Sequence, residues 1–246
     1  DNLATPSITD GSKYFHTQLY TGNGSSGHAI TNDANAGDFQ PDFLWLAPRS
    51  NGDNHVVWDV ARGTTSRIKS NSSGAADVDG TAQLTFEADG FDLDTTDPNY
   101  NGSGRTYVAW QWKTQGGAGS SNTDGSINTT TTSVNQAAGF SINIYTGTKS
   151  NATVGHGLGA VPKMILIKDT TNTESWIVYH EAVGNDGNLY LNLTNAKATQ
   201  AVFQDTTPTS SVFSIGTTDG VNKASAVHVA YCFAEVEGYS SFGGYT

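Results

Sequence analysis

The sequence predicts an all-β protein built from two tandem, diverged antiparallel β-sandwich units of jelly-roll-like type. Only 14% of the 246 residues are charged, and the residues that favour long helices are scarce. β-branched and aromatic residues recur in short runs that Gly, Asn, Asp and Ser clusters separate, which is typical of strands joined by turns. An internal repeat then divides the chain into two parts.

The repeat is defined by separate anchors that share one spacing. Pro41 corresponds to Pro162 in the second copy, at an offset of 162 − 41 = 121 residues. The same offset of 121 joins Trp58 to Tyr179, Gly63 to Gly184, and Trp110 to Tyr231. The opening motif Phe15–Tyr20 matches Phe140–Tyr145 at an offset of 145 − 20 = 125. Self-similarity at a fixed period indicates a duplicated structural unit.

Each copy is expected to contain a similar series of strands. The expected strands are 15–20, 43–46, 56–58, 84–86 with 90–91, and 107–112 in the first copy, and 140–145, 164–167, 176–179, 189–193, 212–215 and 227–233 in the second. The run Tyr107–Trp112 is rich in large apolar residues and is expected to be a central strand.

The predicted organisation has two linkers and two sandwiches. Residues 1–14 form an N-terminal linker, 15–114 the first sandwich, 115–128 a Gly/Ser/Asn/Thr-rich flexible linker, and 129–246 the second sandwich. A single larger sandwich formed from both halves is the alternative. Residue 1 is Asp, and Phe242–Thr246 resemble the start of a further unit. A fragment of a longer protein is therefore an open alternative.

Charge and composition exclude several classes of function. A net charge of −11 and the absence of a Lys/Arg cluster argue against a nucleic-acid ligand. No apolar stretch approaches the roughly 18 residues that a membrane span needs, so no membrane insertion is expected. Cys232 is the only cysteine, which rules out an internal disulfide, and its apolar neighbours predict a buried side chain.

The motifs resemble a family encoded in genomes of marine bacteriophages. Segments Tyr20–Gly24, Phe39–Leu46, Asp59–Gly63 and Tyr107–Trp112 match one block of that family, and Phe140–Gly147, Val154–Ile167, Trp176–His180, Tyr190–Leu193 and Tyr231–Tyr245 match a second block. The family's usual Lys after the first Pro-led strand is replaced by Ala47-Pro48, and its Ser-His pair reads Asn54-His55. The resemblance implies a concanavalin-like fold and a virion structural or tail-associated protein, and it supplies no catalytic residues.

Carboxylate patterns give little support for an enzyme. The string Glu87-Ala88-Asp89-Gly90-Phe91-Asp92 is closest to the paired carboxylates of retaining glycosidases, but Gly90 interrupts the strand. Glu235 and Glu237 are expected to share one face of a polar edge. His156, in a Gly-rich string, is interpreted as a turn histidine that packs on its neighbours. We therefore expect a protein that is not an enzyme.

Two sets of side chains are candidates for binding. Asp92, Asp94 and Asp97 form the densest cluster of oxygen ligands and are a candidate Ca²⁺ site, with a solvated loop as the alternative; no other cofactor is expected. The aromatic residues that lie in Gly/Ser/Asn-rich segments are candidates for surface contacts with a ligand, namely Tyr100, Tyr239, Phe242 and Tyr245.

The function expected from this combination is a virion protein on the exterior of a phage particle. The leading hypothesis is a module of a tail fibre or other adsorption appendage that contacts a host surface glycan or protein. A capsid decoration, head-fibre or spacer domain with a purely architectural role is the alternative, and a glycan depolymerase the third. Its expected partners are other virion proteins, bacterial surface polysaccharide and further copies of itself; three copies are the working number because fibres are usually trimers.

Overall fold

The computed structural model describes residues 6–33 and 38–244. Within these ranges the protein is all-β, with several antiparallel sheets arranged as β-sandwiches, and its α-helices, α1 (Pro98–Asn101) and α2 (Asp219–Asn222), have four residues each. The described chain contains no helix that is long and apolar enough to cross a membrane.

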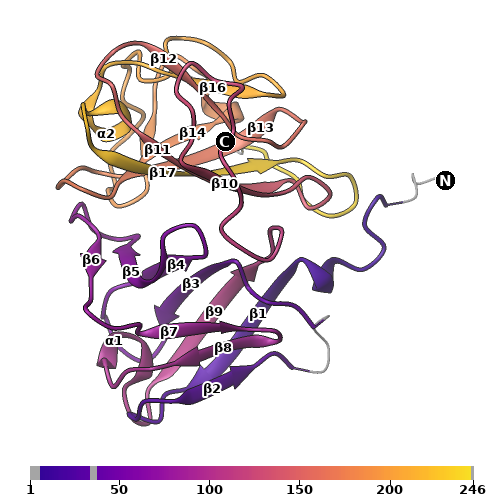
Figure 1. Ribbon diagram of the computed structural model, residues 1–246, viewed down its shortest axis with the longest axis vertical. Coiled ribbons are helices and arrows are strands. Elements are labelled where there is room, and N and C mark those ends of the chain that lie inside the picture. The colour runs from indigo at the N-terminus through magenta and orange to yellow at the C-terminus, as the bar shows by residue number, and fades with distance from the viewer. Residues whose placement is uncertain (1–5, 34–37, 245–246) are drawn as a thin grey trace. The chain divides into compact units, whose positions relative to one another are not determined.

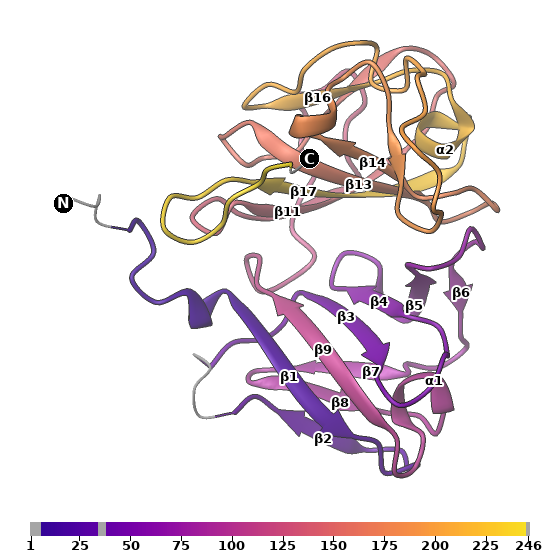
Figure 2. The same ribbon diagram turned by 180° about the vertical axis from the view of Figure 1, so that it is seen from behind.

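The chain divides into two compact units (Figures 1 and 2). The first unit consists of Asp10–Ser72 and Ala76–Ala118, and the second mainly of Gly119–Thr246. The division after residue 118 falls inside the segment 115–128 that the sequence predicts as a linker.

The first unit packs a six-stranded sheet against a three-stranded sheet. The larger sheet has the order β1 (Phe15–Thr21), β9 (Thr106–Trp112), β3 (Phe43–Pro48), β4 (Val56–Asp59), β5 (Gly63–Lys69), β6 (Asp77–Val78). The smaller has the order β2 (His28–Thr31), β8 (Gly90–Leu93), β7 (Leu84–Glu87). Leu44, Leu46 and Trp58 of the larger sheet meet Leu84 and Phe91 of the smaller one in a single core.

The second unit has the same kind of architecture. Its six-stranded sheet has the order β10 (Thr131–Asn135), β11 (Phe140–Thr146), β17 (Val227–Ala234), β13 (Pro162–Asp169), β14 (Ile177–His180), β15 (Leu189–Tyr190). A two-stranded sheet pairs β12 (Ala152–Gly155) with β16 (Val212–Ile215). Val154 and Phe213 of the small sheet share a core with Ile165, Ile167 and Cys232 of the large one.

Matching contacts occur at the short helix of each unit. The hydroxyl of Tyr20 on β1 donates to the carbonyl of Tyr100 in α1 at 2.7 Å, and the hydroxyl of Tyr145 on β11 donates to the carbonyl of Val221 in α2 at 2.7 Å. In both units this hydrogen bond joins a long strand of the large sheet to the helix that precedes β9 or β17.

The structure corrects the predicted linker 115–128. Residues from Gly119 onward are part of the second unit: the N–H of Ile127 donates to Thr153 at 3.0 Å, and the Ile127 side chain lies in the core. The N-terminal segment contains a 3₁₀ helix, η1 (Gly11–Lys13), which the carboxylate of Asp10 caps. In the segment 119–128 the Gly/Ser/Asn/Thr-rich composition resembles that of a linker, but polar side chains such as that of Asn122 close local turns instead.

Candidate functional site

Two adjoining hollows lie on the second unit. The first, of about 310 Å³, is lined by Glu174, Ser175, Ile177, Tyr190, Leu193, Asn195, Gln200, Thr218 and Gly220. The second, of about 450 Å³, is lined by Asn151, Ala201, Gln204, Asp205, Gly216, Thr217 and Thr218. Because both are lined by Thr218, we treat them as one feature, the loop groove.

The loop groove takes its shape from the long connection between β15 and β16. Val202 and Phe203 in the middle of this connection are buried in the core, where the Phe203 ring lies edge-on to that of Tyr179 at 5.5 Å. The N–H of Gly216 donates to the carbonyl of Val202 at 2.7 Å. A Cβ on Gly216 would lie only 2.6 Å from the Ala201 carbonyl, so this close approach requires glycine. The connection is therefore anchored rather than free.

Two neighbouring residues that line the second hollow have a strained backbone. Gln204 and Asp205 have φ angles of 54° and 47°, a region that residues other than glycine adopt rarely. The Gln204 side chain compensates by donating to the carbonyls of Ala152 at 3.0 Å and Ile215 at 2.8 Å, which ties the loop to β12 and β16. Strained residues of this kind cost about 1–3 kcal/mol each and cluster at binding sites.

The lining of the loop groove favours a neutral, hydroxyl-rich ligand. Asn195 and Gln200 are exposed and offer amide donors and acceptors together. Tyr190, half-buried, and Leu193, 45% exposed, supply apolar surface beside them. The described lining contains the carboxylates Glu174 and Asp205 and no Lys, Arg or His, so it has no charge complementary to an anion.

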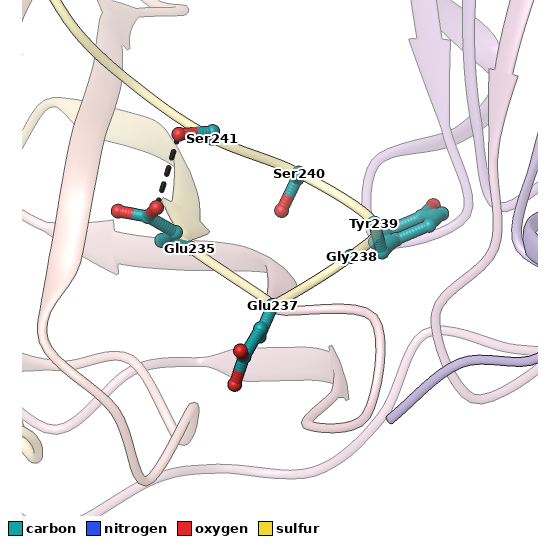
Figure 3. A pocket seen from close by; sticks show the side chains of 6 residues that line it. All are labelled: Glu235, Glu237, Gly238, Tyr239, Ser240 and Ser241. Carbon is teal, nitrogen blue, oxygen red and sulfur yellow. Dashed lines mark hydrogen bonds between the residues drawn. The ribbon is translucent and has the colours of Figure 1, made fainter. Parts of the chain in front are cut away.

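The chain also has a larger hollow of about 720 Å³, which the single loop Glu235–Ser241 lines (Figure 3). Val236 and Ser240 form a β-bridge, so the residues between them make a tight turn. Because of this turn, Glu235 and Glu237 do not share a strand face as expected, and Figure 3 shows their carboxylates pointing apart. Glu235 instead accepts a hydrogen bond from the Ser241 hydroxyl at 3.0 Å.

Comparison with known proteins places the chain in a family. A family model described as a domain of unknown function, DUF7483, matches residues 10–246. The chain belongs to the DUF7483 family. No curated protein and no solved structure matches it.

Three of the four predicted contact aromatics of this DUF7483 member lie in the described residues, in different settings. Tyr100 is only 1% exposed and packs edge-on against Trp58 at 4.9 Å, so its prediction as a surface residue is wrong. It is buried because α1 folds back over the core of the first unit. Tyr239 is half-buried and lines the loop hollow, and the half-buried Phe242 ring lies 6.4 Å from that of His180. Tyr245 lies outside the described residues.

The three predicted calcium ligands are not brought together. In the described part of the DUF7483 chain, no three or more His, Cys, Asp or Glu side chains form a group that could hold a metal ion. Asp97 accepts from the N–H of Asn99 and caps α1, and Asp94 accepts from the Thr85 hydroxyl at 2.8 Å. Asp92 lies on β8. Asp94 and Asp97 therefore have separate local partners and do not share a site.

The remaining chemically suggestive residues have structural roles. Glu87 and Gly90 face each other across the β7–β8 hairpin, so the glycosidase-like string spans a turn rather than one strand face. Burial raises the pKa of the Cys232 thiol, which disfavours the reactive thiolate. His156 packs within its own unit, as predicted: its Nε2 lies 3.1 Å from the Thr209 carbonyl, and its Nδ1 lies 3.2 Å from the N–H of Leu158.

Sequence reasoning missed the loop groove of the DUF7483 chain entirely. The segment 189–193 was expected to be a strand, whereas the strand ends at Tyr190 and the long connection begins there. The available signal was the run of Asn, Thr, Ala and Gln after Leu193, which has no strand periodicity and is too long for a simple turn.

Proposed function

We propose that this chain is a structural protein on the exterior of a phage particle, part of a tail fibre or other adsorption appendage, and that it binds a glycan of the host surface without enzymatic activity. The loop groove is the proposed contact site. The motif resemblance supports the virion assignment, and the chemistry of the groove supports the class of ligand.

The observation that carries the ligand assignment is the combination of amides, hydroxyls and one tyrosine along the loop groove. Sugars present hydroxyl groups that both donate and accept, and amide side chains such as Asn195 and Gln200 match both roles. A sugar also has an apolar face, against which the Tyr190 ring can pack. Display of many copies on a particle would make a weak individual site sufficient.

We further propose that the two units are diverged copies of one jelly-roll or concanavalin-like sandwich. The shared sheet order supports this, since β1-β9-β3-β4 corresponds strand for strand to β11-β17-β13-β14. The equivalent tyrosine hydrogen bonds to α1 and α2 support it as well. Asn101 and Asn222 are separated by the repeat offset of 222 − 101 = 121 residues. The side-chain amide of each donates to two backbone carbonyls.

An architectural role, as a capsid decoration, head-fibre or spacer domain, is the second candidate function. The outer edge of β1, which pairs with no strand among the described residues, favours it, because assembly into larger sheets could use such an edge. The two roles differ in what the loop groove should do, so binding experiments separate them.

The glycan proposal predicts selective loss of binding when the groove is altered. The purified chain, coupled to beads to provide multivalency, would be applied to arrays of bacterial surface polysaccharides. We expect saturable binding, and we expect Tyr190→Ala to weaken it at least tenfold, since stacking area on the sugar is lost.

The matched control is Tyr239→Ala, which removes a half-buried tyrosine from the other hollow and should leave binding unchanged. Absence of binding to every polysaccharide, or equal loss in both variants, would favour the architectural role. Release of shortened sugars during the assay would instead indicate a depolymerase. Immunogold labelling of intact particles with antibodies to the chain tests the exterior location separately.

A further inference from the structure

The outer edge of β1 presents backbone groups that pair with no strand among the described residues; one of them, the Leu19 carbonyl, accepts a hydrogen bond from the side-chain amide of Gln18 at 2.9 Å. In the described residues β1 is outermost in its sheet and pairs with β9 only. The hydrogen bonds from Gly22 N–H to Arg105 and from Lys113 N–H to Tyr14 fix which residues face β9, and these are the even-numbered ones. Because hydrogen-bonded pairs alternate along an antiparallel ladder, the odd-numbered residues direct their N–H and C=O groups away from β9. These residues are Phe15, Thr17, Leu19 and Thr21.

In the second unit, the strand that corresponds to β1 has a further strand paired with its outer edge. β11 occupies the position in its sheet that β1 occupies in the first, next to β17 as β1 is next to β9. There an additional antiparallel strand, β10, pairs with the outer side of β11, with Ser133 opposite Ile142 and Thr131 opposite Ile144. The first unit has no strand in the corresponding place among its described residues.

β1 also lacks the features that normally protect an edge strand. Natural edges are usually very short, or carry Lys, Pro or a bulge. β1 has seven residues, pairs with β9 in an unbroken register, and its sequence Phe-His-Thr-Gln-Leu-Tyr-Thr contains no Asp, Glu, Lys, Arg or Pro. Leu19 is 53% exposed on this strand. Such an edge is suited to pairing with another strand.

We propose that β1 pairs antiparallel with β1 of a second copy of the chain, about a two-fold axis at Gln18. This register places Thr17 opposite Leu19 and Phe15 opposite Thr21 of the partner strand, and it is the two-fold register that pairs all seven residues. The outward-facing groups of one strand then meet those of the other.

A second copy is the occupant that the charges favour. The chain carries a net charge of −11, so most pairs of surfaces from two copies would bring carboxylates together. β1 is free of carboxylates and can meet itself without that repulsion. An isologous contact of this kind closes after two copies, so it predicts a dimer rather than the trimer expected from the fibre analogy.

The test compares association states of the intact chain by sedimentation equilibrium. We expect the wild type to dimerise and Thr17→Pro to be monomeric, because proline removes an outward N–H and leaves the bonds to β9 in place. Leu19→Lys is the second edge variant. Val78→Lys, at the opposite edge of the same sheet on a residue 74% exposed, is the matched control and should dimerise like the wild type.

Cysteine variants test the register even if Thr17→Pro fails to fold. Gln18→Cys should form an intermolecular disulfide under mild oxidation, because Gln18 lies opposite itself in a pair whose Cα atoms are about 4.5 Å apart. His16→Cys, two residues away on the same side of the strand, would lie about 13 Å from its copy and should remain reduced. A monomeric wild type, a trimer, or equal cross-linking of both variants would overturn the proposal.

Discussion

Arg62 has a structural role that the string Asp59–Gly63 alone does not reveal. Its Nε lies 2.6 Å from Oδ2 of Asp59, and its Nη2 donates to the carbonyl of Val57 at 3.1 Å. Both side chains of this ion pair are buried, with exposed fractions of 5% for Arg62 and 0% for Asp59. The pair closes the turn between β4 and β5 and explains the Asp-x-x-Arg-Gly string without any function in binding.

Arg62→Ala should therefore destabilise the first unit strongly. Removing one partner leaves the Asp59 carboxylate buried without its counter-ion, which costs about 3–5 kcal/mol. Urea denaturation would measure this loss of unfolding free energy. Arg105→Ala is the control, because the Arg105–Asp53 pair is over one third exposed and should contribute about 0–1 kcal/mol. Equal effects in the two variants would contradict the role given to Arg62.

His156 makes the stability of the second unit depend on pH. Its contacts fit the neutral ring, in which Nε2–H donates to Thr209 and Nδ1 accepts from the N–H of Leu158. Burial lowers the pKa of His156, and this outweighs the opposing effects of the Thr209 carbonyl and of Asp124. The unfolded chain then takes up a proton before the folded one does, so stability is lost as the pH falls below the ordinary histidine pKa of about 6.5.

The pH effect can be isolated with His156→Asn, whose side-chain oxygen can accept from Leu158 but does not titrate. The unfolding free energy of the wild type should fall more steeply between about pH 7 and pH 5 than that of the variant. Burial also lowers the pKa of His228, which both proteins retain, so only the difference between their slopes reports on His156. Parallel slopes would contradict the assignment.

At the scale of elements, strands with continuous apolar runs could be predicted from the sequence, whereas two strands rich in Thr and Ser could not. The runs that begin at Phe43 and Val227 became β3 and β17 near their expected bounds, because large apolar side chains mark a buried strand. β5 and β10 were missed, since Gly63–Lys69 and Thr131–Asn135 are rich in Thr and Ser, whose composition is also that of loops. Their strand state depends on neighbours that supply hydrogen-bond partners.

Dependence on distant neighbours also decides which features of the candidate site could be predicted from the sequence. The local contact of His156, the hydrogen bond that its Nδ1 accepts from the N–H of Leu158, could be expected from the Gly-rich turn, but its contact with Thr209 could not. The placement of Tyr100 and the lining of the loop groove could not be predicted either, because α1 folds over the first core and Phe203 anchors a long connection in the second. Both depend on contacts between residues far apart in the chain, which a local pattern does not contain.

For the molecule as a whole, the net charge of −11 opposes association even where an edge strand permits it. Salt screens repulsion between whole chains, since the Debye length falls from about 30 Å at 0.01 M to about 10 Å at 0.1 M ionic strength. The hydrogen bonds and apolar contacts of a β1–β1 pair contain no ion pair that salt would weaken.

Dimerisation should accordingly become several-fold tighter as the salt concentration rises from about 20 mM to about 300 mM. Sedimentation equilibrium across this range would measure it, and Leu19→Lys should stay monomeric at each concentration. Glycan binding at the loop groove should change little over the same range, because amide and hydroxyl contacts are weakly screened. A dimer that dissociates with added salt would mean that oppositely charged patches, and not the uncharged edge of β1, hold two copies together.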